Sequence, residues 1–192
     1  TNNIYRMGIQ LIAANAATLE KELEWFRLLA TARMQQYFQQ TTAESPAPPD
    51  LTEDPSVYAQ IINHYGMTQA ERIILLLALI PHIQPQLLDI FFVKNATYDR
   101  GFTEFGGIKG QLHGGFLPTG ETAAFLLAAD GLQPRFNLIR YFSPEHFFAK
   151  HQILRLAPAG DEPLLSGTLS LSAEYLSLVT QGVPQRPDYN TQ

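Results

Sequence analysis

The chain has 192 residues, which is enough for one substantial core or two small ones. Its composition, 45% apolar and 16% charged, is typical of a globular protein and excludes a disordered chain. The net charge of −5 disfavours general binding to nucleic acids or anionic lipids, and the absence of cysteine excludes disulfides, a thiolate nucleophile and a cysteine zinc site.

The sequence predicts a cytoplasmic domain without membrane contact. Its start, TNNIYRMGIQ, lacks the charged and apolar regions of a signal peptide. The longest apolar run, residues 73–80, is shorter than the roughly 20 residues of a membrane helix. The lack of cysteine fits a reducing compartment. The proline-bearing tail, residues 183–192, predicts a linker to a downstream module.

Residues 9–37 predict one long helix, which makes residues 1–40 a helical arm. Apolar or small residues recur at alternate steps of three and four, and no proline or glycine follows Gly8 in this stretch. The period permits a coiled coil and therefore self-association, but Ala16 and Ala30 equally permit a helix that packs on its own domain. We slightly favour the second interpretation. The expected seam consists of Ile9, Ile12, Ala16, Leu19, Leu23, Phe26, Ala30 and Tyr37, with a break at Arg33.

Residues 41–54 contain three prolines and no apolar period, which indicates an extended connector. It separates the arm from a body at residues 55–182. The body begins with a helix, because Asp54 before Pro55 is typical of a helix N-terminus. Gly66 should end this helix.

A second body helix is expected to be buried. Thr68 and Glu71 form a predicted capping box, the following residues are apolar nearly all round, and Pro81 should end the helix. A further helix at residues 86–93 should turn its apolar residues, Phe92 included, towards the core. Two more helices are predicted at residues 121–129 and 134–142, with a restart of one turn that Ser143 caps.

The period then changes from helical to strand-like. Residues 151–156 and 163–171 predict two strands of a β-hairpin around a turn at residues 157–162. Ser172 caps a closing helix that Gly182 ends. The expected fold class is therefore mainly α with a small β-hairpin (α+β), a variant winged-helix-like domain preceded by a long N-terminal helix.

Residues 98–120, YDRGFTEFGGIKGQLHGGFLPTG, contain over half of the chain's 13 glycines. This density implies positive φ angles or close backbone approach, and the interleaved aromatic residues indicate order. Lys109 precedes Gly110 where a phosphate loop requires serine or threonine, and the glycine spacing does not fit a dinucleotide-binding motif. We therefore favour a structured loop whose aromatics and Lys109 dock a partner.

The sequence shows no pattern typical of catalysis or metal binding, so we expect neither a catalytic residue nor a metal or cofactor in this chain. His146 lacks a second histidine at zinc-motif spacing, and a G-x-S-x-G nucleophile elbow is absent. Asp99 and Glu104 lie near the glycine-rich loop, where structural pairing is favoured over acid–base chemistry. Of the histidines, only the glycine-flanked His113 has surroundings that hint at function.

A DNA-binding winged helix normally carries a basic recognition helix and a basic wing. Basic residues are scattered here, and the expected wing tip carries Asp161 and Glu162. A DNA-binding regulator that uses residues 135–140 and the hairpin at residues 151–171 is kept as the alternative function. An enzyme that uses the glycine-rich loop as a substrate pocket is the least favoured.

The stretch at residues 87–127, with the later FSPEHFFAKHQILRL and PLLSGTLSLSAEYL, resembles the N-terminal region of a group of bacterial AAA+ ATPases. The resemblance covers residues 52–182. Members of this group are similar to the AAA+ proteins encoded with contractile, phage-tail-like injection systems, and a variant winged-helix domain precedes their ATPase module.

The resemblance implies a non-catalytic adaptor that positions a ring ATPase on a protein substrate or assembly. Neither a phosphate loop nor a Walker B strand is present in these residues, so ATP and magnesium would bind only in a downstream module. We expect a protein partner to contact seven residues, namely Tyr98, Arg100, Phe102, Phe105, Lys109, His113 and Phe116.

Overall fold

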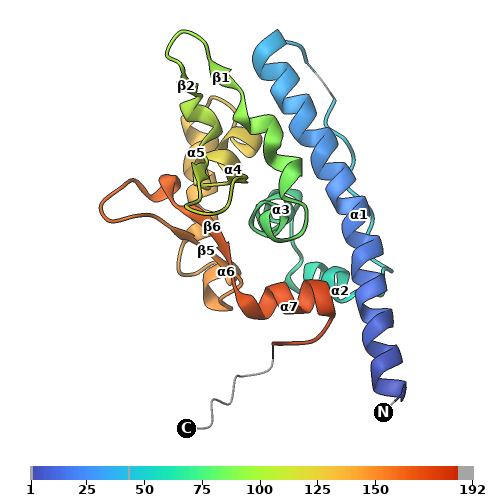
Figure 1. Ribbon diagram of the computed structural model, residues 1–192. Helices are drawn as coiled ribbons and strands as arrows, with labels where there is room; N and C mark the ends of the chain where they lie inside the picture. Colours follow the sequence, from blue (N-terminus) through green and yellow to red (C-terminus); the bar gives the residue numbers. More distant parts are fainter. Residues whose placement is uncertain (1, 43, 186–192) are drawn as a thin grey trace.

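The computed structural model describes residues 2–42 and 44–185. These residues form a mainly helical fold with three two-stranded antiparallel sheets, and a long helix, α1 (Asn2–Gln39), runs along one side of the body (Figure 1). The predicted fold class, mainly helical with a small hairpin and a long N-terminal helix, is confirmed. Most of the tail that we interpret as a linker, residues 186–192, lies outside the described residues.

Helix α1 packs on its own body through its middle and C-terminal half. It contacts α2 (Val57–Tyr65), α3 (Gln69–Ile83) and α7 (Ala173–Gln181). The predicted seam is wrong at its start, because Ile9 and Ile12 are 51% and 41% exposed. The buried stripe of α1 instead includes polar residues that form hydrogen bonds with the body. It consists of Asn15, Thr18, Leu19, Glu22, Trp25, Phe26 and Ala30.

A buried polar cluster joins α1 to α3. Glu22 is fully buried and accepts hydrogen bonds from Arg72 Nε (3.1 Å), Arg72 Nη2 (2.7 Å) and Tyr58 Oη (2.9 Å). The Arg72 guanidinium also lies 4.8 Å from the ring centroid of Trp25. Because a buried charge is costly unless it is paired and hydrogen-bonded, these contacts fix the position of α1 on the body.

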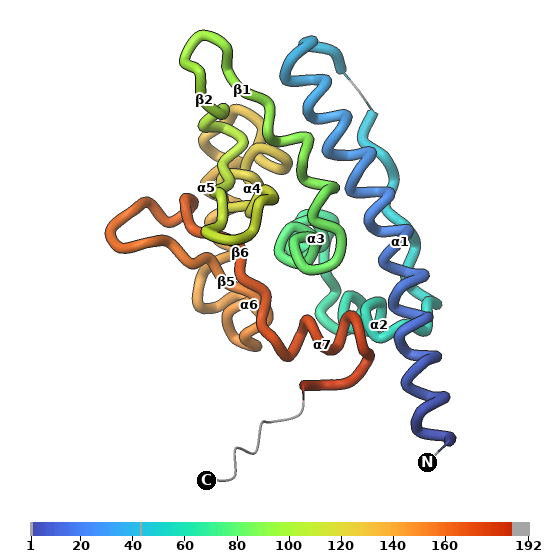
Figure 2. The backbone as a smooth tube through the Cα atoms, in the orientation of Figure 1, coloured from blue at the N-terminus to red at the C-terminus, as the bar shows by residue number. Residues whose placement is uncertain are grey.

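The proline-rich connector runs back along α1 instead of standing apart from it (Figure 2). Trp25 Nε1 donates to the Pro46 carbonyl oxygen (3.3 Å), and Arg72 donates to that of Pro49 (3.0 Å). The described part of the connector has no regular secondary structure, as expected. The Pro46 and Pro49 carbonyl groups have no partner in a helix or sheet, and these hydrogen bonds from Trp25 and Arg72 satisfy them.

Helices α2 and α3 show how local signals set the element boundaries. Ser56, and not Asp54, is the N-cap of α2, while the Asp54 carboxylate accepts from the Ser56 backbone N–H (2.9 Å). Gly66 ends α2 in a left-handed conformation, and the capping box that opens α3 is present. Pro81 does not end α3, because it removes only one donor while the Gln84 N–H still bonds to the Ile80 carbonyl (2.9 Å).

Helix α3 is the centre of the core. Its residues from Ile73 to Ile80 are all buried, in agreement with the prediction. Among the described residues, no single helix is long and apolar enough to cross a membrane; α3 and the following 3-10 helix η1 (Pro85–Phe92) pass that test together but meet at 108°. The α-helix that we predicted at residues 86–93 is wrong in type, because these residues form the 3-10 helix η1. Phe92 is 46% exposed there instead of buried.

Two small hairpins and a run of short helices follow η1. Strands β1 (Lys94–Asn95) and β2 (Arg100–Gly101) form the first hairpin, and β3 (Ile108–Lys109) and β4 (Phe116–Leu117) form the second. The sequence analysis missed both, because strands of two residues have no readable period. The other elements in this part of the chain are η2 (Thr103–Phe105), α4 (Gly120–Leu127), α5 (Leu132–Ile139), η3 (Arg140–Phe142) and α6 (Phe147–Lys150).

The predicted C-terminal hairpin is present but shorter than expected. It pairs β5 (Leu154–Ala157) with β6 (Thr168–Leu171), and the short η4 (Leu164–Ser166) lies between them. The strands place Leu154 opposite Leu171, and both are buried on the side of α3. Ser172 caps α7 and Gly182 ends it, as predicted, whereas α6 is capped by His146 and not by Ser143.

Candidate interaction surface

The glycine-rich segment contains β2 and the whole second hairpin, and the β1–β2 hairpin lies near the C-terminal end of α1 (Figure 1). Between the two hairpins lies a pocket of about 200 Å³. Five lining residues other than glycine are exposed or half-buried, and we call them the hairpin pocket residues: Phe92, Lys94, Phe102, Ile108 and Lys109. At the hairpin tips, Tyr98 is 69% exposed and Leu112 is fully exposed.

Gly106 and Gly107 allow the floor of the pocket to form. Both have positive φ angles, 62° and 81°, which favour glycine. A Cβ atom on Gly107 would lie 2.2 Å from the ring of Phe116, so this ring packs directly on the glycine backbone. The glycines therefore act by close backbone approach, as the sequence analysis expected, and they hold an aromatic ring instead of a ligand.

Buried threonines hold the turn between the second hairpin and α4. The Gly107 N–H donates to Thr119 Oγ1 (3.1 Å), and the Thr119 N–H donates to Thr122 Oγ1 (3.1 Å). The Thr122 hydroxyl in turn donates to the Phe105 carbonyl oxygen (2.7 Å). Because these polar groups are buried and paired, they fix the backbone that carries the pocket.

An aromatic cluster supports the pocket from inside. The Phe105 ring lies 4.7 Å from that of Phe125, 5.0 Å from that of Phe102 and 5.4 Å from that of Tyr37, measured between centroids. The Tyr37 hydroxyl donates to the Glu104 carboxylate, and this hydrogen bond, with burial, raises the pKa of Tyr37 to about 12. The end of α1 is thereby attached to the glycine-rich segment.

The seven residues expected to contact a partner fall into two groups. Tyr98, Arg100 and Lys109 are exposed and Phe102 is half-buried, so these four are accessible. The side chain of Arg100 lies over the Tyr98 ring, 5.7 Å from its centroid. The other three residues are less accessible.

Phe105 and Phe116 are only 1% and 4% exposed, and they face the core. His113 is half-buried, and its Nε2 is buried without a hydrogen-bond partner among the described residues. A Cβ atom on Gly115 would lie 2.5 Å from this nitrogen, so the imidazole folds over its own loop. Phe105, Phe116 and His113 therefore support the surface from inside, and they are less accessible to a partner than the other four residues.

The sequence analysis missed Phe92, Lys94 and Ile108. The sequence analysis placed Phe92 in a buried helix, and it singled out neither Lys94 nor Ile108. Only the structure shows that Phe92 and Ile108, which are 46% and 48% exposed, line the same pocket as Lys94 and Lys109.

The structure also describes the surroundings of the basic residues that the DNA-binding alternative requires. Arg135 donates two hydrogen bonds to the Glu121 carboxylate, one of them 2.8 Å long from Nη1 to Oε2. This pairing neutralises the charge of Arg135 at the start of the proposed recognition helix. Asp161 and Glu162 at the tip of the β5–β6 hairpin are exposed.

In the part of the chain that the structure describes, no group of three histidine, aspartate or glutamate side chains could hold a metal ion. A comparison of the sequence with protein-family models and curated proteins, and of the fold with solved structures, found no match. The resemblance to AAA+ N-terminal regions therefore stays a prediction.

Proposed function

We propose that this chain is a non-catalytic interaction domain that binds a protein partner through the hairpin pocket. In line with the sequence resemblance, it would serve in the cytoplasm as the N-terminal adaptor of an AAA+ ATPase and position that ATPase on a protein substrate or assembly. The observation that carries the proposal is that the exposed Phe92 and Ile108 line one pocket together with Lys94 and Lys109.

The pocket is suited to a short peptide segment. Exposed aromatic and aliphatic side chains on a fixed support are typical of protein interfaces, and the support here is the aromatic cluster and the paired threonines. The two lysines favour carboxylates next to the apolar side chain that enters the pocket. The partner segment would therefore be an apolar residue flanked by aspartate or glutamate.

A peptide array tests this binding. It should carry sequences with a central leucine or phenylalanine flanked either by acidic residues or by lysines. We expect the acidic peptides alone to be retained, with binding that weakens as salt is raised. The double variant Lys94→Glu/Lys109→Glu should lose this binding, while Lys21→Glu, an exposed lysine on α1, should not.

Equal retention of acidic and basic peptides, or unchanged binding by the double variant, would contradict the proposal.

Mobility-shift experiments with generic duplex DNA at low salt should show no complex. A salt-sensitive complex that disappears in Arg135→Ala/Arg140→Ala would favour the DNA-binding alternative. The link to an ATPase has a separate test, which is whether a phosphate-loop ATPase module is encoded in the same reading frame.

A further inference from the structure

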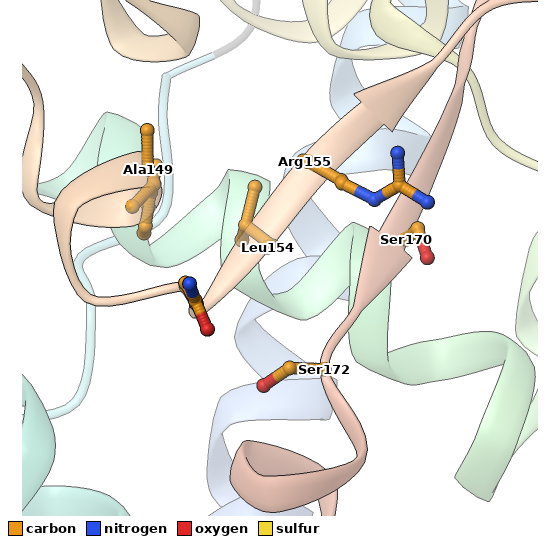
Figure 3. Close-up of a pocket in the computed structure, with 7 residues that line it drawn as sticks. Ala149, Leu154, Arg155, Ser170 and Ser172 are labelled. Atoms are coloured by element: carbon orange, nitrogen blue, oxygen red, sulfur yellow. The ribbon is translucent and has the colours of Figure 1, made fainter. Parts of the chain in front are cut away.

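A second, larger pocket of about 400 Å³ lies between the end of α6 and the β5–β6 hairpin. Figure 3 shows Arg155 extending from β5 towards β6, next to Ser170 on the neighbouring strand, with Ser172 further along the chain before α7. The pocket shares no lining residue with the hairpin pocket. Its lining consists of Phe148, Ala149, Gln152, Leu154, Arg155, Ser170 and Ser172.

The lining combines an apolar part with hydrogen-bond donors. Phe148 and Leu154 are 1% and 4% exposed, so their positions are fixed by the core. Arg155 carries the single charge among the lining residues, and no carboxylate within residues 2–42 and 44–185 pairs with it. Its planar guanidinium group can bind a carboxylate through two parallel hydrogen bonds.

The serines and Gln152 add further donors. Ser172 Oγ accepts the Tyr175 backbone N–H (3.3 Å) as the N-cap of α7, which leaves its own hydroxyl proton free to donate. Ser170 lies opposite Arg155 in the strand register. Gln152 brings a side-chain amide, which has two N–H donors.

The backbone of Gln152 has a conformation that is uncommon for residues other than glycine. Gln152 has a φ of 52° and ends α6, where its N–H bonds to the Ala149 carbonyl (3.1 Å) and the Ile153 N–H bonds to the Phe148 carbonyl (2.9 Å). This helix-ending geometry strongly favours glycine. Glutamine thus occupies a position that is unfavourable for its backbone, and its side chain lines the pocket.

We infer that this pocket binds a small carboxylate with an apolar body, such as an aryl or short alkyl carboxylic acid. The carboxylate pairs with the Arg155 guanidinium and accepts hydrogen bonds from the Gln152 amide and the serine hydroxyls. The apolar body lies against Ala149 and the apolar stem of Arg155, which are both exposed and line the pocket. The volume lies within the range of small-molecule sites, and such sites commonly combine an apolar lining with a few converging polar groups.

A titration of the ¹⁵N-labelled protein with benzoate and with hexanoate, followed by NMR, tests the inference. We expect saturable shifts of the backbone amides of Gln152, Arg155, Ser170 and Ser172. Benzyl alcohol, which has the same apolar body without the charge, should bind roughly tenfold more weakly or worse. Saturation by neither carboxylate, equal binding of benzyl alcohol, or shifts confined to other residues would overturn the inference.

Two arginine variants distinguish benzoate binding in the pocket from benzoate binding to positive charge elsewhere on the protein. Arg155→Met keeps the length and apolar stem of the side chain, and it should weaken benzoate binding by roughly tenfold or more. Arg140→Met removes an exposed arginine that does not line the pocket, and it should leave the affinity unchanged. An equal loss in both variants would show binding to diffuse positive charge and contradict a site.

Gln152→Gly gives the sharpest outcome because stability and binding should change in opposite directions. Glycine suits the left-handed backbone, so the melting temperature should rise by about 2–4 °C. Benzoate affinity should fall several-fold, since the amide donor is lost. A rise in melting temperature with unchanged affinity would remove Gln152 from the site and overturn the role that we assign to its amide.

Discussion

Glu22 is the residue on which the position of α1 most depends. Its carboxylate is fully buried, and it is paired with Arg72 and hydrogen-bonded to Tyr58. The seam predicted from apolar spacing passed over it, because a glutamate on a helix is ordinarily solvent-exposed. Only the tertiary partners on α2 and α3 explain why it lies inside.

Glu22→Met should lower the free energy of unfolding by about 3–5 kcal/mol, because it leaves the Arg72 charge and the Tyr58 hydroxyl buried without their main partner. The triple variant Glu22→Met/Tyr58→Phe/Arg72→Met removes all three polar groups and should recover most of that loss. Urea unfolding followed by circular dichroism measures both. A triple variant less stable than Glu22→Met would show that the cluster itself is net stabilising.

Tyr37 should make folding sensitive to alkaline pH. Its pKa is raised from 10.0 to about 12, first by the hydrogen bond to Glu104 and then by burial. The folded state therefore holds this proton more tightly than the unfolded state, so the stability that it contributes is complete below pH 10 and is lost as the pH rises through about 12.

The measurement is the free energy of unfolding between pH 9 and pH 12 for the wild type and for Tyr37→Phe. The wild type should lose stability more steeply with pH than the variant does. Absorbance of tyrosinate at 295 nm should place the Tyr37 transition near pH 12 in the difference between the two proteins. Parallel pH profiles would refute the hydrogen bond. The subtraction is needed because the pKa of Tyr175 is also raised, by burial and by its contact with Tyr65.

At the scale of elements, the two hairpins should depend on Gly107 far more than on neighbouring glycines. Gly107→Ala places a Cβ atom on the Phe116 ring at a φ of 81°, so it should destabilise the protein by about 2–4 kcal/mol. Gly101→Ala is the matched control, because a Cβ atom there meets no neighbouring atom within 4 Å. It should change stability by about 0.5 kcal/mol or less. Urea midpoints that shift equally would contradict the role assigned to Gly107.

The elements also show what local sequence can predict. The Thr68 and Glu71 capping box, the glycine after α2 and the Ser172 cap are set by a few neighbouring residues, and the sequence predicted all of them. Pro81 was misread, because its effect depends on how many helical hydrogen bonds follow it. The two small hairpins were missed, because their strands have only two residues each and are too short to show a period.

The same limit applies to the candidate site. The interleaved glycines and aromatics of residues 98–120 correctly pointed to an ordered segment. They could not tell the exposed Tyr98 from the buried Phe105 and Phe116, because all three have similar side chains and lie between similar neighbours. Which aromatic faces outwards is decided by α1 and α4, whose Tyr37 and Phe125 cover one side of the segment.

For the molecule as a whole, we expect the N-terminal end of α1 to contribute little to stability and its middle to be essential for folding. Ile4, Tyr5 and Ile9 are exposed, whereas Phe26 is fully buried, and Leu11 packs against the end of α7 at Gly182. Deletion of residues 1–10 should therefore keep the melting temperature within about 2–4 °C, equivalent to about 1 kcal/mol. Deletion of residues 1–40 should abolish cooperative unfolding, because it removes Trp25 and Phe26 from the core.

Thermal unfolding followed by circular dichroism distinguishes the two deletions. Phe26→Ala in the full chain is the corresponding point variant and should cost about 3–5 kcal/mol. A stable, cooperatively folding protein without residues 1–40 would show instead that α1 is a separable arm.

Trp25 gives this architecture a built-in optical reporter. It is the chain's single tryptophan, it is 3% exposed, and it touches both the connector through Pro46 and α3 through Arg72. Its emission colour depends on whether water reaches the indole, so detachment of the connector would shift the emission to the red while the helical content is still intact. Without any added label, the fluorescence of Trp25 can thus report detachment of the connector separately from global unfolding.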